Sequence, residues 1–95
     1  MNREEAFQAL QAEVEKLRGH QYEKLTSMIK APFTREHMAK SGRQYQVEVS
    51  TAWDDKKKKV LRLFFSVDNG GLGAFTPLTK SGLVEPGTAF SGEVE

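Results

Sequence analysis

The chain has 95 residues, of which 14 are Lys or Arg and 13 are Asp or Glu, so its formal net charge is only +1. This balance argues against a strongly basic nucleic-acid binder, and the length fits one domain. The absence of cysteine excludes disulfides, thiolate metal ligands and a cysteine nucleophile. Because the N-terminus is polar and no apolar run reaches about 18 residues, we expect a cytoplasmic protein that does not enter a membrane.

The N-terminal third has helical periodicity. Apolar residues spaced by three and four predict a first helix between Asn2, which can cap its start together with Glu5, and Gly19, which suits its end. A second, shorter helix is predicted over residues 21–30, because Pro32 disfavours helical geometry at the residue before it. The core residues expected from these helices are Phe7, Leu10, Val14, Leu17, Leu25 and Ile29.

Residues 33–42 are compatible with two structures. Thr34 could cap a short helix, with Phe33 and Met38 forming a hydrophobic staple. Alternatively, the segment leads into a three-residue hairpin turn at residues 40–42, in which Gly42 takes the position that a bulge requires. We favour the hairpin, because a strand pattern begins immediately afterwards.

From Gln44 onward apolar and polar residues alternate, which predicts antiparallel strands with one buried face. The first of these strands is expected to end near Trp53. A turn at residues 54–57 leads into a second strand, which starts at residue 58 or 59 and ends at Val67. The inward-facing residues are predicted to be Tyr45, Val47, Val49, Thr51, Trp53, Leu61, Leu63, Phe65 and Val67.

Glycine and proline mark the turns of the C-terminal third. Residues 68–71, Asp-Asn-Gly-Gly, predict a tight turn, followed by a third strand near residues 72–78, which Pro77 would place at an edge. Residues 85–88 fit a type II turn joining very short strands around Leu83-Val84 and Ala89-Phe90. The predicted fold is therefore one α+β domain, with two N-terminal helices packed on one face of an antiparallel β-meander of three to five strands.

The sequence lacks a recognisable catalytic, metal-ligating or cofactor-binding arrangement. The two histidines, His20 and His37, do not form a metal-binding motif, and the glycine-rich stretch at residues 69–73 lacks the Lys-Ser/Thr end of a P-loop. Ser27 and Lys30 match a serine-acylase spacing that chance alone readily produces. We therefore predict a non-enzymatic interaction or accessory module, without cofactor or metal, that acts through its sheet surface.

Phe64 is the main candidate for a partner contact, because it lies on the otherwise polar outward face of its strand. A two-residue turn at residues 69–70 would place Phe75 opposite Phe64 as an exposed aromatic pair. A three-residue turn, which we favour because it gives Gly71 a role, would place Phe75 opposite Phe65 in the core and Thr76 opposite Phe64.

In either register Phe64 is predicted to anchor a homodimer or another protein partner. The alternative is that the C-terminal segment around Leu83, Val84 and Phe90 folds over it.

A basic run gives an alternative function, a nucleic-acid-binding accessory protein. Lys56, Lys57, Lys58 and Lys59 could contact a phosphate backbone while Trp53 stacks on a base. Two neighbouring aspartates cancel half of this charge, and lysine-rich turns also keep hairpins soluble, so we favour a solvated turn. A third possibility is a small-molecule site in a pocket between helices and sheet.

Overall fold

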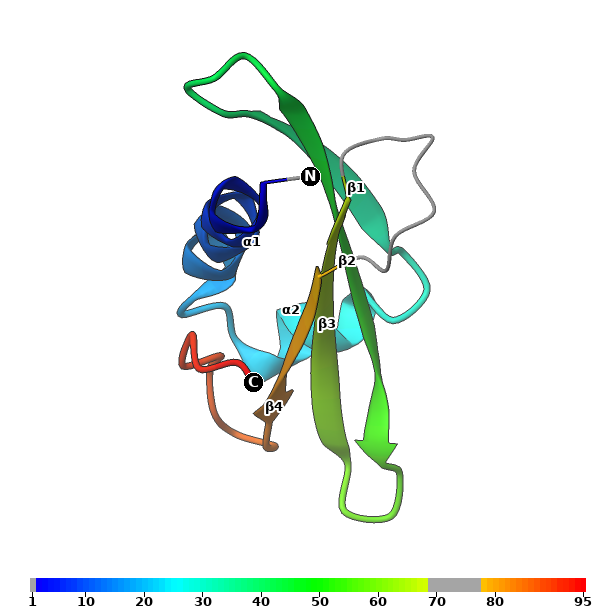
Figure 1. Cartoon of the computed structure of the whole chain (residues 1–95). Helices are drawn as coiled ribbons and strands as arrows, with labels where there is room; N and C mark the ends of the chain where they lie inside the picture. Colours follow the sequence, from blue (N-terminus) through cyan, green and yellow to red (C-terminus); the bar gives the residue numbers. More distant parts are fainter. Residues whose placement is uncertain (1, 69–77) are drawn as a thin grey trace.

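Within the described part of the chain, two helices precede a four-stranded antiparallel meander, and the predicted α+β fold is confirmed. The computed structural model describes residues 2–68 and 78–95. Sheet order is β1-β2-β3-β4, and Figure 1 shows α1 and the C-terminal segment on the same side of the sheet. The elements are α1 (Arg3–Leu17), α2 (Tyr22–Ser27), β1 (Phe33–Met38), β2 (Gln44–Asp55), β3 (Val60–Asp68) and β4 (Leu78–Val84).

Local signals at the ends of α1 act as predicted. The Asn2 side chain accepts a hydrogen bond from the Glu5 amide at 3.0 Å, and Gly19 has the left-handed φ of +87° that follows a helix. The Glu5 carboxylate accepts a hydrogen bond from the Tyr45 hydroxyl at 2.9 Å, so it joins α1 to β2. The second helix is shorter than predicted, since α2 ends at Ser27.

The hairpin interpretation of residues 33–42 is confirmed. The Ala39 amide donates to the Arg43 carbonyl at 2.8 Å, which closes a three-residue turn. Gly42 has a φ of +89°, a conformation that glycine adopts without steric cost. The strand β1 that precedes this turn pairs with β2 along its whole length, from Phe33 opposite Val49 to Met38 opposite Gln44.

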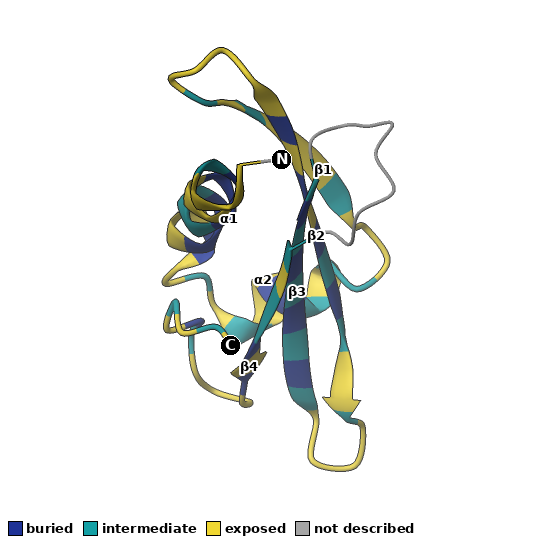
Figure 2. Cartoon of the chain, viewed as in Figure 1, coloured by how far each residue is buried: buried dark blue, intermediate teal, exposed yellow. Residues whose placement is uncertain are grey.

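The core lies between the inner face of the sheet and the helices. Buried and half-buried residues alternate along β3, visible as bands in Figure 2, and the four predicted inward residues of this strand are buried. Trp53 lies opposite Leu61, on the inward face predicted for both, but its side chain is 36 % exposed. Ile29 is only partly buried against this core.

The prediction that Phe7 belongs to the core is wrong, because its side chain is 44 % exposed. The small residues Ala6 and Ala9 occupy the buried face of α1 instead, together with Leu10. Small side chains at these positions let the helix approach the sheet closely, which leaves Phe7 at the margin of the contact.

The predicted pairing of the third strand with β3 is wrong, and residues 72–77 of that predicted strand lie outside the described residues. The strand that pairs with β3 is β4, which begins with Leu78 opposite Val67 and ends with Val84 opposite Leu61. Phe64 consequently lies opposite Ser81, so neither Phe75 nor Thr76 is its cross-strand partner. Phe65 lies opposite Lys80, which likewise excludes the pairing with Phe75.

The sequence of β4, Leu-Thr-Lys-Ser-Gly-Leu-Val, alternates too weakly to identify this strand. The predicted tight turn, Pro77 and Phe75 itself lie outside the described residues.

The C-terminal segment returns to the inner side of the sheet. The turn at residues 85–88 is present, with the Thr88 amide donating to the Glu85 carbonyl at 3.2 Å. After it, Ala89 pairs with Gln21 instead of residues 83–84. Phe90 is buried against Phe65, so the predicted alternative in which this segment covers Phe64 is wrong.

Candidate functional site

The outer face of the sheet, opposite the helices, is the principal candidate surface. Residues that lie opposite one another on β2, β3 and β4 form rows across this face. The central row consists of Ser50, Phe64 and Ser81, and the adjacent row consists of Ala52, Arg62 and Leu83. Phe64 is half-buried, and Leu83 is 50 % exposed. The two apolar side chains therefore stand beside small residues and Arg62 on a face where the described helices do not pack.

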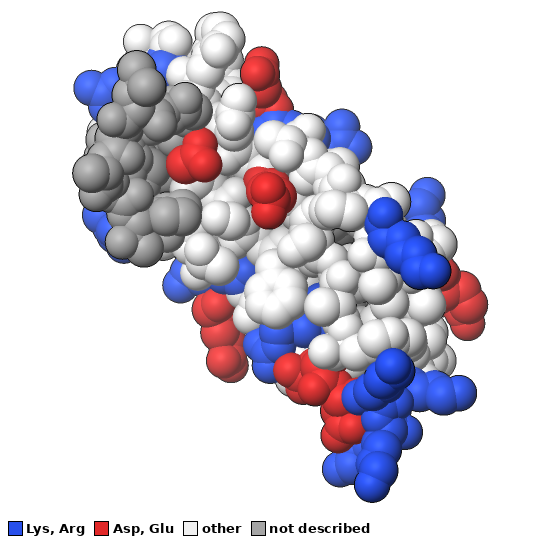
Figure 3. Space-filling model, turned by 90° about the vertical axis from the view of Figure 1, so that its right-hand side faces the viewer, with Lys and Arg blue, Asp and Glu red and all other residues white. Residues whose placement is uncertain are grey.

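Arg62 is the single basic residue of these two rows, and its charge is compensated locally. Its Nε donates to the Asp54 carboxylate at 2.8 Å, and its guanidinium also donates to the Ser81 hydroxyl at 2.8 Å. Figure 3 shows a largely uncharged area on this face and a group of lysine and arginine side chains at one end with acidic side chains beside them, while further side chains of both signs lie along the rest of the face. A low-charge centre with compensated polar groups is typical of the core of a protein interface.

The four predicted lysines occupy an exposed turn at one end of the sheet, between β2 and β3. The backbone of the turn is fixed at two points: the Lys59 carbonyl accepts from the Tyr22 hydroxyl at 2.6 Å, and the Asp55 carboxylate accepts from the Lys58 amide at 3.1 Å. The lysine side chains themselves remain exposed. Trp53 shares the inner face with Leu61, whereas Phe64 is on the outer face, so the two predicted aromatic contacts belong to different surfaces.

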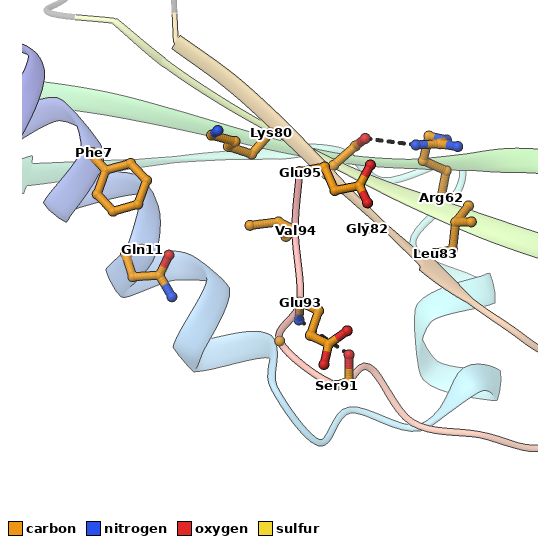
Figure 4. Close-up of a pocket in the computed structure, with 12 residues that line it drawn as sticks. Phe7, Gln11, Arg62, Lys80, Gly82, Leu83, Ser91, Glu93, Val94 and Glu95 are labelled. Carbon is orange, nitrogen blue, oxygen red and sulfur yellow. Dashed lines mark hydrogen bonds between the residues drawn. The ribbon is translucent and has the colours of Figure 1, made fainter.

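A groove of about 690 Å³ lies along α1, the edge strand β4 and the C-terminal segment, and its lining includes Arg62, Ser81 and Leu83 of the outer-face rows. The sequence did not identify its lining residues. In Figure 4, Phe7 and Gln11 project from α1, while Lys80 and Val94 extend toward them from the sheet side. Phe7 is exposed because its side chain lines this groove. The groove forms because residues 91–95 return to the edge of β4, which is a long-range event that local patterns do not encode.

A buried carboxylate is a second feature that sequence reasoning missed. Glu13 of α1 is fully buried, and its Oε1 lies 2.8 Å from His37 Nε2 and 3.3 Å from Lys16 Nζ. Its Oε2 lies 3.3 Å from Arg35 Nε, although this contact lacks hydrogen-bond geometry. The side chains therefore attach α1 to the edge strand β1. The burial of Glu13 could have been suspected from its position, since it follows Leu10 by three residues and therefore lies on the apolar stripe of the helix.

Glu5 forms a further polar contact between α1 and the sheet. Hydrogen bonds from the side chains of Ser41 and Tyr45, together with the nearby positive charge of Arg43, lower the pKa of the Glu5 carboxyl below its ordinary value. Glu5, Tyr45 and His37 line a small hollow of about 180 Å³. These groups have clear structural partners, so this hollow is a weaker candidate than the outer face.

Within residues 2–68 and 78–95, no group of three or more His, Asp or Glu side chains is arranged to hold a metal ion. Over the same part of the chain, no helix has the length and apolar character needed to cross a membrane. Comparisons with protein-family models, with curated proteins and with solved structures gave no significant match to this chain. Function must therefore be argued from the surfaces themselves.

Proposed function

We propose that this protein is a non-enzymatic interaction module that binds another protein chain through the outer face of its sheet. The observation that carries the proposal is the low-charge centre of this face, where Phe64 and Leu83 stand among Ser50, Ala52 and Ser81. Apolar side chains grouped on a sheet face that the described helices do not cover favour association with a partner. The partial exposure of Phe64 suits an interface anchor, since aromatic residues are enriched at such contacts.

The matched pair Phe64→Ser and Phe7→Ser tests this proposal. Both variants replace a partly exposed phenylalanine, one on the outer face and one on α1. Immobilised wild-type protein and both variants are compared by quantitative mass spectrometry of retained proteins, after circular dichroism has verified folding. We expect Phe64→Ser to lose partners that Phe7→Ser retains. Equal retention by a folded Phe64→Ser protein would exclude the outer face.

The groove beside α1 favours a second function, the binding of a small molecule between helix and sheet. Its walls combine the apolar surface of Phe7 and Val94 with the charged Lys80. Thermal stabilisation of the wild type in a metabolite screen, lost in Phe7→Ser and retained in Phe64→Ser, would support this function. The same two variants separate the two hypotheses, because Phe7 lines the groove and Phe64 does not, although the groove and the outer face share Arg62, Ser81 and Leu83.

A further inference from the structure

We infer that the partner on the outer face is a second copy of this chain, packed face to face about a two-fold axis that lies in the interface, perpendicular to the strands. This inference rests on the proposed function, because it uses the same surface. It adds the identity of the partner and the direction in which the two sheets meet.

The net charge of the outer face differs between its two ends along the strands: the four lysines stand beside Asp54 and Asp55 at one end, and the turn residues Lys40 and Arg43 lie near the acidic residues at the other end. Glu48 on β2 and Glu36 on β1 are exposed on this face toward one end. The exposed turn formed by Lys56, Lys57, Lys58 and Lys59 lies at the other end. Glu48 and Lys56 are separated by about 25 Å of strand, well beyond the screening length of about 8–10 Å, so they do not compensate each other within one chain.

A two-fold axis perpendicular to the strands exchanges these two ends. The lysine turn of each protomer then lies against Glu36 and Glu48 of the other, which gives two equivalent attractive contacts. An axis parallel to the strands would instead place lysines over lysines and glutamates over glutamates. Charge complementarity therefore selects the antiparallel arrangement.

The same axis places the apolar residues at the centre. Halfway between Glu48 and Lys56 along β2 is Ala52, whose row contains Arg62 and Leu83. Phe64 lies one row away, so the Phe64 rings of both protomers would flank the axis. Small neighbours allow the sheets to approach to about 10 Å, the usual spacing of packed sheets. Since Asp54 pairs with Arg62, association would bury little uncompensated charge.

The two edges of the sheet are less suited to pairing with a second copy. At β4, Glu95 already exchanges two backbone hydrogen bonds with Ser81, at 3.0 and 2.8 Å. At the other edge, β1 carries Arg35 and Glu36 side by side, and charged side chains oppose edge-to-edge addition of strands. The outer face is therefore the favoured contact.

Charge reversal tests both the partner and the direction. We compare the wild type with Lys57→Glu/Lys58→Glu and with Glu36→Lys/Glu48→Lys by sedimentation and light scattering. The wild type is expected to be a dimer, and each reversal is expected to raise its dissociation constant about tenfold or more. Mixing the two variants should restore association, because one contact then joins a reversed turn to a reversed acidic site, the other joins a native turn to a native acidic site, and both are attractive.

Lys24→Glu/Lys30→Glu is the matched control, since both lysines are exposed and belong to the α2 region. It should leave the dimer unchanged. A folded Phe64→Ser protein should be monomeric. Failure of the mixture to associate, with a dimer present in the wild type, would overturn the antiparallel arrangement.

The proposed function and this inference fail in different ways. A wild type that is monomeric at about 0.1 mM overturns the dimer. If that monomer still retains another protein in a Phe64-dependent manner, the proposed function stands without the dimer. A dimer that persists in Phe64→Ser and in both charge reversals uses another surface, which overturns this inference.

Discussion

Phe90 stacks on Phe65 inside the protein, with ring centroids 5.9 Å apart and ring planes inclined by 24°. The Phe90 carbonyl accepts from the Gly19 amide at 2.8 Å, and its amide donates to the His20 carbonyl at 3.0 Å. The C-terminal segment is therefore part of the core and is attached to the end of the first helix. This contact also keeps the segment away from the outer face.

Replacement of Phe90 by alanine is expected to destabilise the protein strongly. Because the ring is 1 % exposed, its loss should lower the free energy of unfolding by about 3–5 kcal/mol, as measured by urea denaturation. Leu83→Ala is the control, since its exposed side chain should contribute much less in dilute solution. A loss below about 1 kcal/mol for Phe90→Ala would mean that the segment is not held in the core.

Gly82→Ala should displace the C-terminal segment. A methyl group at this position would lie 2.5 Å from the Glu93 carbonyl oxygen and 3.0 Å from Phe90 Cε1. Overlap with backbone cannot be relieved by a side-chain rotation, so we expect a loss of about 1–3 kcal/mol. Hydrogen exchange should show faster exchange of the Ser81 and Glu95 amides. Unchanged protection of these amides, as expected for exposed Thr79→Ala, would contradict the close approach.

Glu13 should matter more than an exposed glutamate on the same helix. Glu13→Ala removes the carboxylate that contacts Lys16, Arg35 and His37, with an expected loss of about 1–3 kcal/mol, limited by the solvent exposure of Lys16 and Arg35. Glu15→Ala removes only an exposed pair with Arg18 and should cost less than about 0.5 kcal/mol. Equal losses in chemical denaturation would show that the buried cluster has no special role.

Glu5 should contribute to stability above its ordinary carboxyl pKa and lose that contribution in acid. Its pKa is lower in the folded protein than the ordinary 4.5, so the folded state favours the carboxylate. This contribution is fully present above pH 4.5 and disappears as the pH falls through the lowered pKa. Urea denaturation of wild type and Glu5→Gln should therefore converge in acid. A stability difference that does not change with pH would contradict the shift.

Replacing Lys56, Lys57, Lys58 and Lys59 by Gln should leave the thermal stability of the monomer nearly unchanged, since the four side chains are exposed. Calorimetry in dilute solution measures this. If the turn binds nucleic acid, as the sequence-based alternative states, the wild type must bind single-stranded DNA at low salt. The substitutions should then flatten the salt dependence by up to about four charges. Absence of binding by the wild type would eliminate that alternative.

Local structure could be predicted from the sequence because its causes are local. Asn2 caps α1 by a contact three residues away, and Gly42 permits the hairpin turn by its own φ. The alternation in β2 and β3 identifies which side chains are buried, because successive residues of a strand point to opposite faces. The same alternation predicted that Phe64 points to the outer face, while the next residue, Phe65, is buried on the inner face.

Only the tertiary structure decided the position of β4 and the path of the C-terminal segment. Phe64 meets Ser81, and Phe90 meets Phe65, across separations in sequence that no turn or periodicity specifies. The exposure of Phe7 and the burial of Glu13 were settled in the same way. Helical spacing puts both near the apolar stripe, but which of them is covered depends on how closely α1 approaches β1 and β4, and that distance is set by packing of the whole core.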